Sequence, residues 1–139
     1  MKFIDGEGEL TILVEDRTPI GVQGAGDFAL RTKLAIRNVN SAFSADTRCW
    51  ISKESFTTFL RDFKKFEETL EGKAELDSMS PGEFWISFKR YSAAGQVMAE
   101  GQVGRHWPEN PKMMELYFRF NIDQTFLKKY LSEFETWAE

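Results

Sequence analysis

Apolar and polar residues alternate along seven stretches of the chain, and a spacing of two is typical of strands that bury one face. The expected strands cover residues 8–15, 27–38, 43–50, 73–77, 83–91, 96–104 and 114–122. The links between most of them are short, which favours antiparallel neighbours over parallel crossovers. The pattern therefore predicts antiparallel sheet along much of the chain.

Two other stretches, residues 52–70 and 123–137, carry apolar residues at spacings of three and four, which predicts amphipathic helices. The first stripe consists of Phe56, Phe59, Leu60, Phe63, Phe66 and Leu70, and the second of Phe126, Leu127, Tyr130, Leu131, Phe134 and Trp137. Ser52 and Asp123 stand where an N-cap is expected, because their side chains can accept hydrogen bonds from free backbone amides. Gly72 is expected to supply the left-handed residue that ends the first helix.

The resulting element order is β-β-β-α-β-β-β-β-α, which predicts an α+β fold. We expect one curved antiparallel β-sheet of about six or seven strands, packed against two α-helices that cover its inner face. No linker, repeat or low-complexity segment divides the chain. A single domain spanning residues 1–139 is therefore expected.

Composition supports a folded protein, since 42% of the 139 residues are hydrophobic and 13 are Phe. The single cysteine, Cys49, excludes an intrachain disulfide and is typical of a reducing compartment. The start MKFIDGEGEL lacks the basic and apolar regions of a signal peptide, and no apolar run reaches the ~20 residues of a membrane span. We expect a cytoplasmic protein without membrane insertion.

The excess negative charge is concentrated at the start of the chain. The formal net charge of −4 falls entirely within residues 1–27, where only Lys2 and Arg17 oppose the acids. Those acids are Asp5, Glu7, Glu9, Glu15, Asp16 and Asp27. A surface of this kind would attract basic partners and repel nucleic-acid phosphate, although solubility is the plainer interpretation of the same charge.

Residue chemistry offers no catalytic or metal-binding set. His106 is the only histidine and Cys49 the only thiol, whereas a zinc site needs three or four protein ligands. Asp5, Glu7 and Glu9 lie two residues apart and could face a hard cation such as calcium, but the pattern does not match the twelve-residue calcium loop. We predict no metal, no cofactor and no enzymatic activity.

Two features suggest binding. In the loop RHWPENP, His106 and Trp107 could form a binding tip, or Trp107 could fold back onto the sheet edge. The outer face of the expected sheet would interleave basic and aromatic residues: Arg31, Lys33, Arg37, Arg48, Trp50, Trp85, Lys89, Tyr91, Tyr117 and Arg119. Such a face could stack bases or hold an acidic protein surface, but a pI near 5.2 argues against nucleic acid.

Three segments together resemble a known family: RCWISKESFTTFLRDFKKFEETLEGKAEL, EFWISFKRYSAAGQVMAEGQV and MELYFRFNIDQTFLKKYLSEF. The chain is similar to the WapI-like bacterial toxin-immunity family, in which a strand ending in Trp leads to a Phe-rich helix, a Gly and a strand. The shared positions include Trp50, Phe56, Leu60, Gly72, Phe118, Asp123, Gln124 and Leu127. The resemblance covers residues 28–137 and leaves the acidic first 27 residues outside it.

The resemblance implies a bacterial immunity protein that neutralises a polymorphic or contact-dependent toxin by stoichiometric binding. The implied partner is a cognate protein toxin, and the chain is expected to be a monomer or a weak homodimer that binds neither nucleic acid nor membrane. The hypothesised contact residues are Asp5, Glu7, Glu9, Glu15, Asp16, His106 and Trp107. Two alternatives stay open: a ligand binder with a Phe-lined cavity of ~300 Å³ or more between sheet and helices, and a protein-interaction domain.

Overall fold

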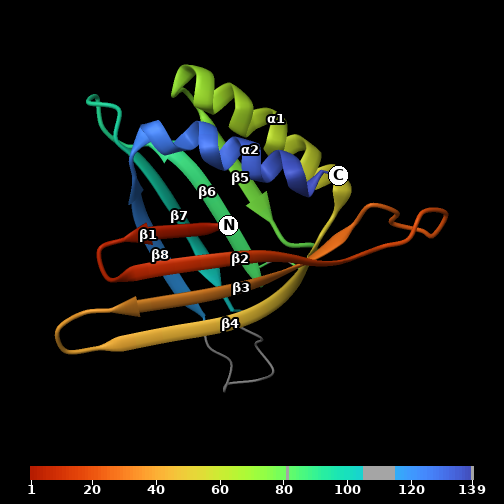
Figure 1. Cartoon of the computed structure of the whole chain (residues 1–139), viewed down its shortest axis with the longest axis horizontal. Helices are drawn as coiled ribbons and strands as arrows, with labels where there is room; N and C mark the ends of the chain where they lie inside the picture. The colour runs from red at the N-terminus through yellow and green to blue at the C-terminus, as the bar shows by residue number, and fades with distance from the viewer. Residues whose placement is uncertain (81, 105–114, 139) are drawn as a thin grey trace.

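The structure, a computed structural model, describes residues 1–80, 82–104 and 115–138 (Figure 1). The strands are β1 (Lys2–Asp5), β2 (Gly8–Arg17), β3 (Phe28–Arg37), β4 (Ala42–Ile51), β5 (Lys73–Asp77), β6 (Phe84–Arg90), β7 (Val97–Val103) and β8 (Leu116–Ile122). The helices are α1 (Lys53–Thr69), a short 3-10 helix η1 (Gln124–Phe126) and α2 (Leu127–Trp137). The α+β class and the antiparallel pairing are confirmed.

Both predicted caps accept hydrogen bonds from backbone amides, but Asp123 caps the 3-10 helix η1, and α2 itself begins only at Leu127. The Ser52 side chain accepts a hydrogen bond from the Ser55 amide at 3.1 Å, and the Asp123 side chain accepts one from the Thr125 amide at 2.9 Å. The end of α1 differs from the expectation, because Leu70 takes the left-handed conformation (φ 54°) and donates its amide to Phe66. Gly72 is also left-handed but lies beyond that cap.

The strands form two sheets, so the prediction of one sheet with six or seven strands is wrong. Sheet A has the order β1-β2-β3-β4 and sheet B the order β5-β6-β7-β8. The two are separated in sequence by α1, after which β5 begins a new sheet beside β6. Two hydrogen bonds link them. The Asn121 amide donates to the Asp5 carboxylate at 2.9 Å, and the Met79 amide donates to the Trp50 carbonyl at 2.8 Å.

The strand that the sequence missed is β1. It is four residues long and turns into β2 through Gly6, which has a positive φ of 55°. Such a strand is too short for alternation to be visible, yet its Phe3 is buried against Phe88 of β6 and Tyr130 of α2. This strand therefore ties sheet A to the rest of the core.

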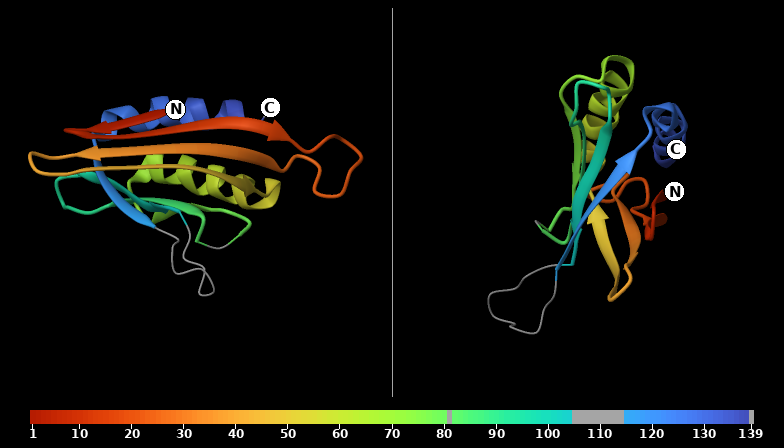
Figure 2. Two further views of the ribbon diagram at one scale, coloured as in Figure 1. Left: turned by 90° about the horizontal axis from the view of Figure 1, so that it is seen from below. Right: turned by 90° about the vertical axis from the view of Figure 1, so that its left-hand side faces the viewer.

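The core is built mainly from phenylalanine rings. Phe88 of β6 and Phe134 of α2 contact each other and both contact Phe63 of α1, with ring centroids 4.9–6.1 Å apart. Phe56 of α1 meets Phe28 of β3 edge to face at 5.2 Å. These rings fill the space between helices and sheets that an interior ligand would need, and each helix contacts both sheets (Figure 2).

Sheet A has two distinct ends. At one, which we call the pocket end, the segment 18–27 projects between β2 and β3, beside the start of α1 (Figure 1). At the other, which we call the hairpin end, the turn 38–41 joins β3 to β4. The long strands of sheet A thus run from one region of the surface to another that is separate from it.

Candidate partner-binding surface

The five acids predicted to bind a partner lie in two groups rather than one. Asp5, Glu7 and Glu9 lie around the turn between β1 and β2, at the hairpin end, whereas Glu15 and Asp16 lie at the pocket end of β2. Glu9 and Glu15 are six residues apart on one strand, a separation of about 20 Å at the usual rise per residue. A single compact acidic site is therefore absent from this part of the chain.

At the hairpin end the three carboxylates have different surroundings. Asp5 accepts the Asn121 amide, and Glu9 forms an ion pair with Lys2 at 3.1 Å. Glu7 is exposed in the turn, where the chain reverses between Asp5 and Gly8. The described residues contain no group of three or more His, Cys, Asp or Glu that could hold a metal ion.

At the pocket end the acids are paired with a base from another strand. Arg48 of β4 forms ion pairs with Glu15, at 2.9 Å, and with Asp16. The same guanidinium lies 5.6 Å from the ring centre of Trp50, which is partly exposed. The outer face of sheet A thus presents an Arg–Trp pair and two neutralised carboxylates, and not a free acidic edge.

The expected platform of basic and aromatic residues is divided between the sheets. On sheet A, Arg31 donates two hydrogen bonds to Asp46, at 3.0 and 2.9 Å, and thereby lowers the pKa of that carboxyl. On sheet B, Lys89 and Arg119 contact Glu100 at 2.6 and 3.3 Å; the hydrogen bond from Lys89 is the largest influence lowering the pKa of Glu100. Because four of the bases, namely Arg31, Arg48, Lys89 and Arg119, pair with carboxylates, neither face is a continuous positive surface.

Three further residues singled out in the sequence add nothing to a described binding surface. His106 and Trp107 lie outside the described residues. Cys49 is buried in sheet A, and burial raises the pKa of its thiol from the ordinary 9.0 to about 12. A buried thiol with so high a pKa is a poor nucleophile at neutral pH.

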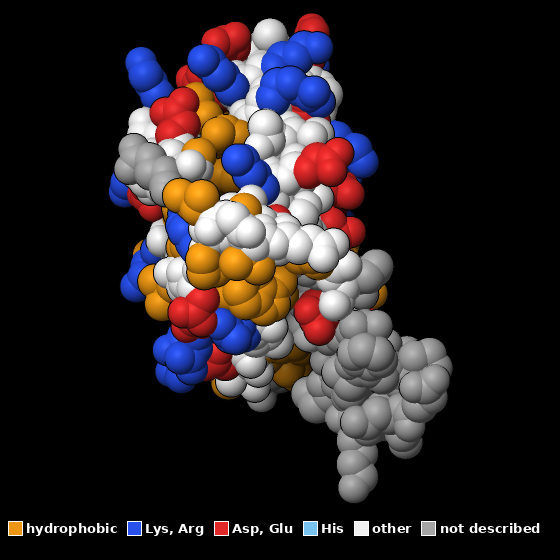
Figure 3. All heavy atoms as spheres, turned by 90° about the vertical axis from the view of Figure 1, so that its right-hand side faces the viewer, with side chains coloured by type: hydrophobic (Ala, Val, Ile, Leu, Met, Phe, Trp, Pro, Cys, Tyr) orange, Lys and Arg blue, Asp and Glu red, His pale blue; other side chains and the backbone are white. Residues whose placement is uncertain are grey.

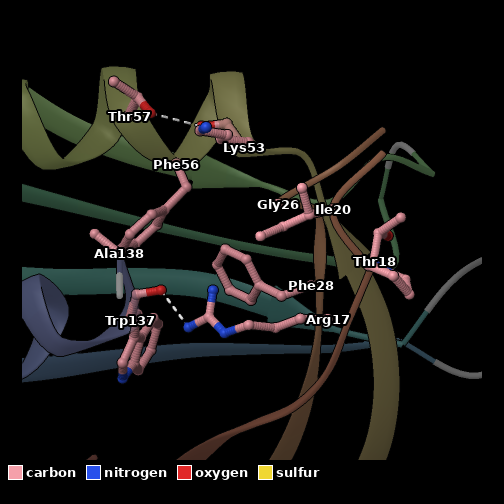
Figure 4. A pocket seen from close by; sticks show the side chains of 11 residues that line it. Arg17, Thr18, Ile20, Gly26, Phe28, Lys53, Phe56, Thr57, Trp137 and Ala138 are labelled. Carbon is pink, nitrogen blue, oxygen red and sulfur yellow. Dashed lines mark hydrogen bonds between the residues drawn. The ribbon is translucent and has the colours of Figure 1, made fainter. Parts of the chain in front are cut away.

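A pocket opens at the pocket end between segment 18–27, the first turn of α1 and the end of α2 (Figure 4). Its volume is about 410 Å³. Three largely buried aromatic residues contribute to its lining, namely Phe28, Phe56 and Trp137. We call it the Arg17 pocket, because the Arg17 guanidinium lies 5.1 Å from the centre of the Phe28 ring and donates a hydrogen bond to the Trp137 carbonyl.

The two charged side chains that line the Arg17 pocket, among the described residues, are cationic. Arg17 and Lys53 both line it, and within the described residues neither forms an ion pair with a carboxylate. Asp27, which follows the lining residue Gly26, accepts a hydrogen bond from the backbone amide of Lys53 at 2.9 Å, at the start of α1. An anionic group from outside would find two cationic side chains here.

Exposed apolar side chains lie beside this pocket. Ile20, which lines it, is 100% exposed, and Val22 in the same segment is 54% exposed. Figure 3 views this end of the molecule and shows apolar side chains gathered at its centre with charged side chains around them. Exposed apolar groups of this kind are frequent where proteins meet.

Sequence reasoning missed this pocket because its walls come from three distant segments. The segment DRTPIGVQGAG, residues 16–26, predicts only a loop, because Pro19 and three glycines interrupt any regular pattern. A usable sign was present, since Ile20 and Val22 are apolar residues in a segment otherwise rich in Gly and polar residues.

Comparison with known proteins identifies the family. The model of the immunity protein WapI-like family matches residues 3–139, so the chain belongs to that family. The match includes the acidic start, which the resemblance seen in the sequence had left outside. No curated protein and no solved structure matches the chain. Neither α1 nor α2, the α-helices among the described residues, is long and apolar enough to cross a membrane.

Proposed function

We propose that this chain neutralises a cognate protein toxin by direct one-to-one binding and catalyses no reaction. The observation that carries the proposal is membership of the immunity family over residues 3–139. The burial and raised pKa of Cys49 support it, because they remove the only thiol as a nucleophile at neutral pH. The toxin partner, the cytoplasmic location and the monomer or weak homodimer remain predictions.

The contact surface is proposed to include the pocket end of sheet A. Trp50 and Arg48 are exposed there side by side, and these residue types often dominate binding energies. A standard interface buries about 800 Å² on each partner, an area large enough to extend from Glu15 and Asp16 across neighbouring strands. The acids at the hairpin end would then flank the contact.

The function is tested by titrating the activity of a purified cognate toxin domain, to be sought in the genes beside this one, with the purified chain. One-to-one binding predicts that inhibition is complete when the two are equimolar, with a sharp break in the titration. Complete inhibition at a small fraction of the toxin concentration would indicate catalysis instead. An absence of inhibition at any ratio would contradict the proposed function.

The contribution of the acids is tested by co-expression with the same toxin domain. Reversing both Glu15 and Asp16 to Lys is expected to weaken protection, because Arg48 loses its ion-pair partners and the contact surface changes sign. Reversing Glu7 and Glu9 to Lys is expected to weaken protection less. Full protection by the Glu15→Lys, Asp16→Lys variant would reject the acidic residues as part of the contact.

The alternative of a ligand cavity between sheet and helices is confined to the Arg17 pocket, which Phe28 of sheet A and Phe56 of α1 line, since aromatic rings occupy the deeper interior. The alternative of a protein-interaction domain differs from immunity only in the partner. A pull-down from the host that recovers a stable complex without the toxin would favour it.

A further inference from the structure

We infer that the Arg17 pocket is the anchor site for the toxin, and that it receives an apolar side chain flanked by a carboxylate. This inference rests on the proposed function and adds to it the place of contact and the chemistry of the partner. It is independent of the acidic residues discussed above, because the charges that line the pocket are positive.

The size and lining of the pocket favour an apolar group. A volume of about 410 Å³ lies within the range of about 300 to 1,000 Å³ that is usual for binding pockets. Phe28, Phe56 and Trp137 provide apolar surface, and their rings are fixed by packing against one another at 5.2–6.5 Å between centres. A side chain that entered would meet a rigid site, which reduces the entropy lost on binding.

The charges favour a carboxylate beside that group. The Arg17 guanidinium is held by the Trp137 carbonyl and by the Phe28 ring, and it has further N–H donors. The acids next to it in sequence, Glu15 and Asp16, are paired with Arg48. Lys53 provides a second cation, and it forms no ion pair with a carboxylate among the described residues. Complementarity of charge therefore selects an acidic partner group.

The surroundings favour a protein over a small molecule. Ile20 is fully exposed and Val22 is largely exposed on the segment that forms one wall. A small ligand inside the pocket would leave Val22, outside the lining, in water, whereas the surface of a protein would cover both side chains. Burying exposed apolar area is the main favourable term in protein association.

The test measures the affinity of the purified toxin domain for the whole chain and for two variants of the pocket. Ile20→Asp adds a charge to the apolar wall, and Lys53→Glu reverses a cation. Each is expected to raise Kd at least about tenfold. Neither should impair folding, because Ile20 is fully exposed and an acid at the start of a helix is favourable.

Two matched controls make the test specific. Val39→Asp changes an apolar residue that is 96% exposed at the hairpin end, and Lys64→Glu reverses an exposed lysine farther along α1. Both should leave Kd within about twofold of the unmodified chain. Raising salt from about 50 to about 500 mM should weaken toxin binding by the unmodified chain more than toxin binding by the Lys53→Glu variant. The reason is that salt screens the charge contact that the variant has already lost.

The outcomes separate this inference from the proposed function. If the unmodified chain binds the toxin but Ile20→Asp and Lys53→Glu bind equally well, the anchor site is wrong and the function stands. Equal losses of toxin affinity in the pocket variants and in the controls would also overturn the inference. If a small carboxylate such as phenylacetate stabilises the free chain while both variants bind toxin normally, the pocket serves a small ligand and the inference fails. A chain that binds no toxin contradicts both proposals.

Discussion

The two ends of sheet A each place an apolar side chain in water, yet they differ in what lies beneath it. At the hairpin end Val39 is 96% exposed, and Phe43 is 54% exposed and lines a hollow of about 520 Å³ together with Glu7, Glu9 and Arg37. At the pocket end Ile20 is fully exposed, but it borders a pocket lined by packed aromatic rings and two cations. Exposure alone is common on protein surfaces; exposure beside a hollow with packed aromatic walls favours binding.

The largest expected difference between the ends is in packing. Phe28→Ala should lower the free energy of unfolding by about 3 to 5 kcal/mol, because Phe28 is buried against Phe56 and Trp137. Phe43→Ala should lower it by less than about 1 kcal/mol, since the ring is half exposed. Urea unfolding measures both. Equal losses would mean that the aromatic lining of the pocket is not part of the core.

Thiol reactivity gives a second comparison. Cys49 lies in the half of β4 nearer the pocket end, and the rise in its pKa from 9.0 to about 12 lowers its thiolate fraction at pH 8 about a thousandfold. Alkylation of the native chain should be correspondingly slow. Ser44→Cys in a Cys49→Ser background, exposed at the hairpin end, should react at the rate of a free thiol.

The same raised pKa predicts a dependence of stability on alkaline pH. Because the folded thiol keeps its proton more tightly than the unfolded thiol, its contribution is complete below pH 9 and is lost as pH rises toward about 12. Cys49→Ser should therefore lose less stability than the unmodified chain over that interval. Identical alkaline unfolding curves, or rapid alkylation of Cys49 at pH 8, would contradict its burial.

A smaller effect is expected from the arginines that mark the two ends. Arg17→Met should lower the free energy of unfolding by about 1 to 2 kcal/mol, because it removes the hydrogen bond to Trp137 and the contact with the Phe28 ring. Arg37→Met is the control, since its exposed side chain has no hydrogen bond or ion pair within the described residues. Thermal unfolding of both variants would show whether the end of α2 depends on Arg17.

The smallest effect is expected midway between the ends, at the exposed pair of Arg31 and Asp46. Hydrogen bonds from Arg31 hold the pKa of Asp46 below its ordinary value of 3.8. The stabilisation is therefore complete above that value and is lost as pH falls through the lower folded pKa. Asp46→Asn should show a slightly shallower loss of melting temperature between about pH 6 and about pH 3. A steeper loss would contradict the pairing.

Local features of the fold were predictable from sequence. The alternation of Leu34 and Ile36 with charged neighbours predicted strand β3, and Ser52 and Asp123 predicted the helix starts. The antiparallel pairing of neighbours was predictable from the short links, but the division into two sheets was not, because a spacing of two shows that a strand exists but not which sheet it joins. The four residues of β1 were too few to show any spacing.

The candidate site was harder to predict for the same reason. Arg48 reaches Glu15 and Asp16 because of the register of β2, β3 and β4. In that register Leu13 lies opposite Arg31, and Arg31 lies opposite Arg48. Sequence showed the acids but not their partner on another strand. The Arg17 pocket likewise depends on contacts between residues more than a hundred positions apart.

The most direct test of the account is amide hydrogen exchange on the chain with and without one equivalent of the toxin domain. Binding at the Arg17 pocket predicts that the toxin slows exchange in residues 17–28 and 53–57 and leaves the hairpin end, residues 36–44, unchanged. Slowed exchange confined to residues 36–44, with residues 17–28 and 53–57 exchanging as in the free chain, would contradict it.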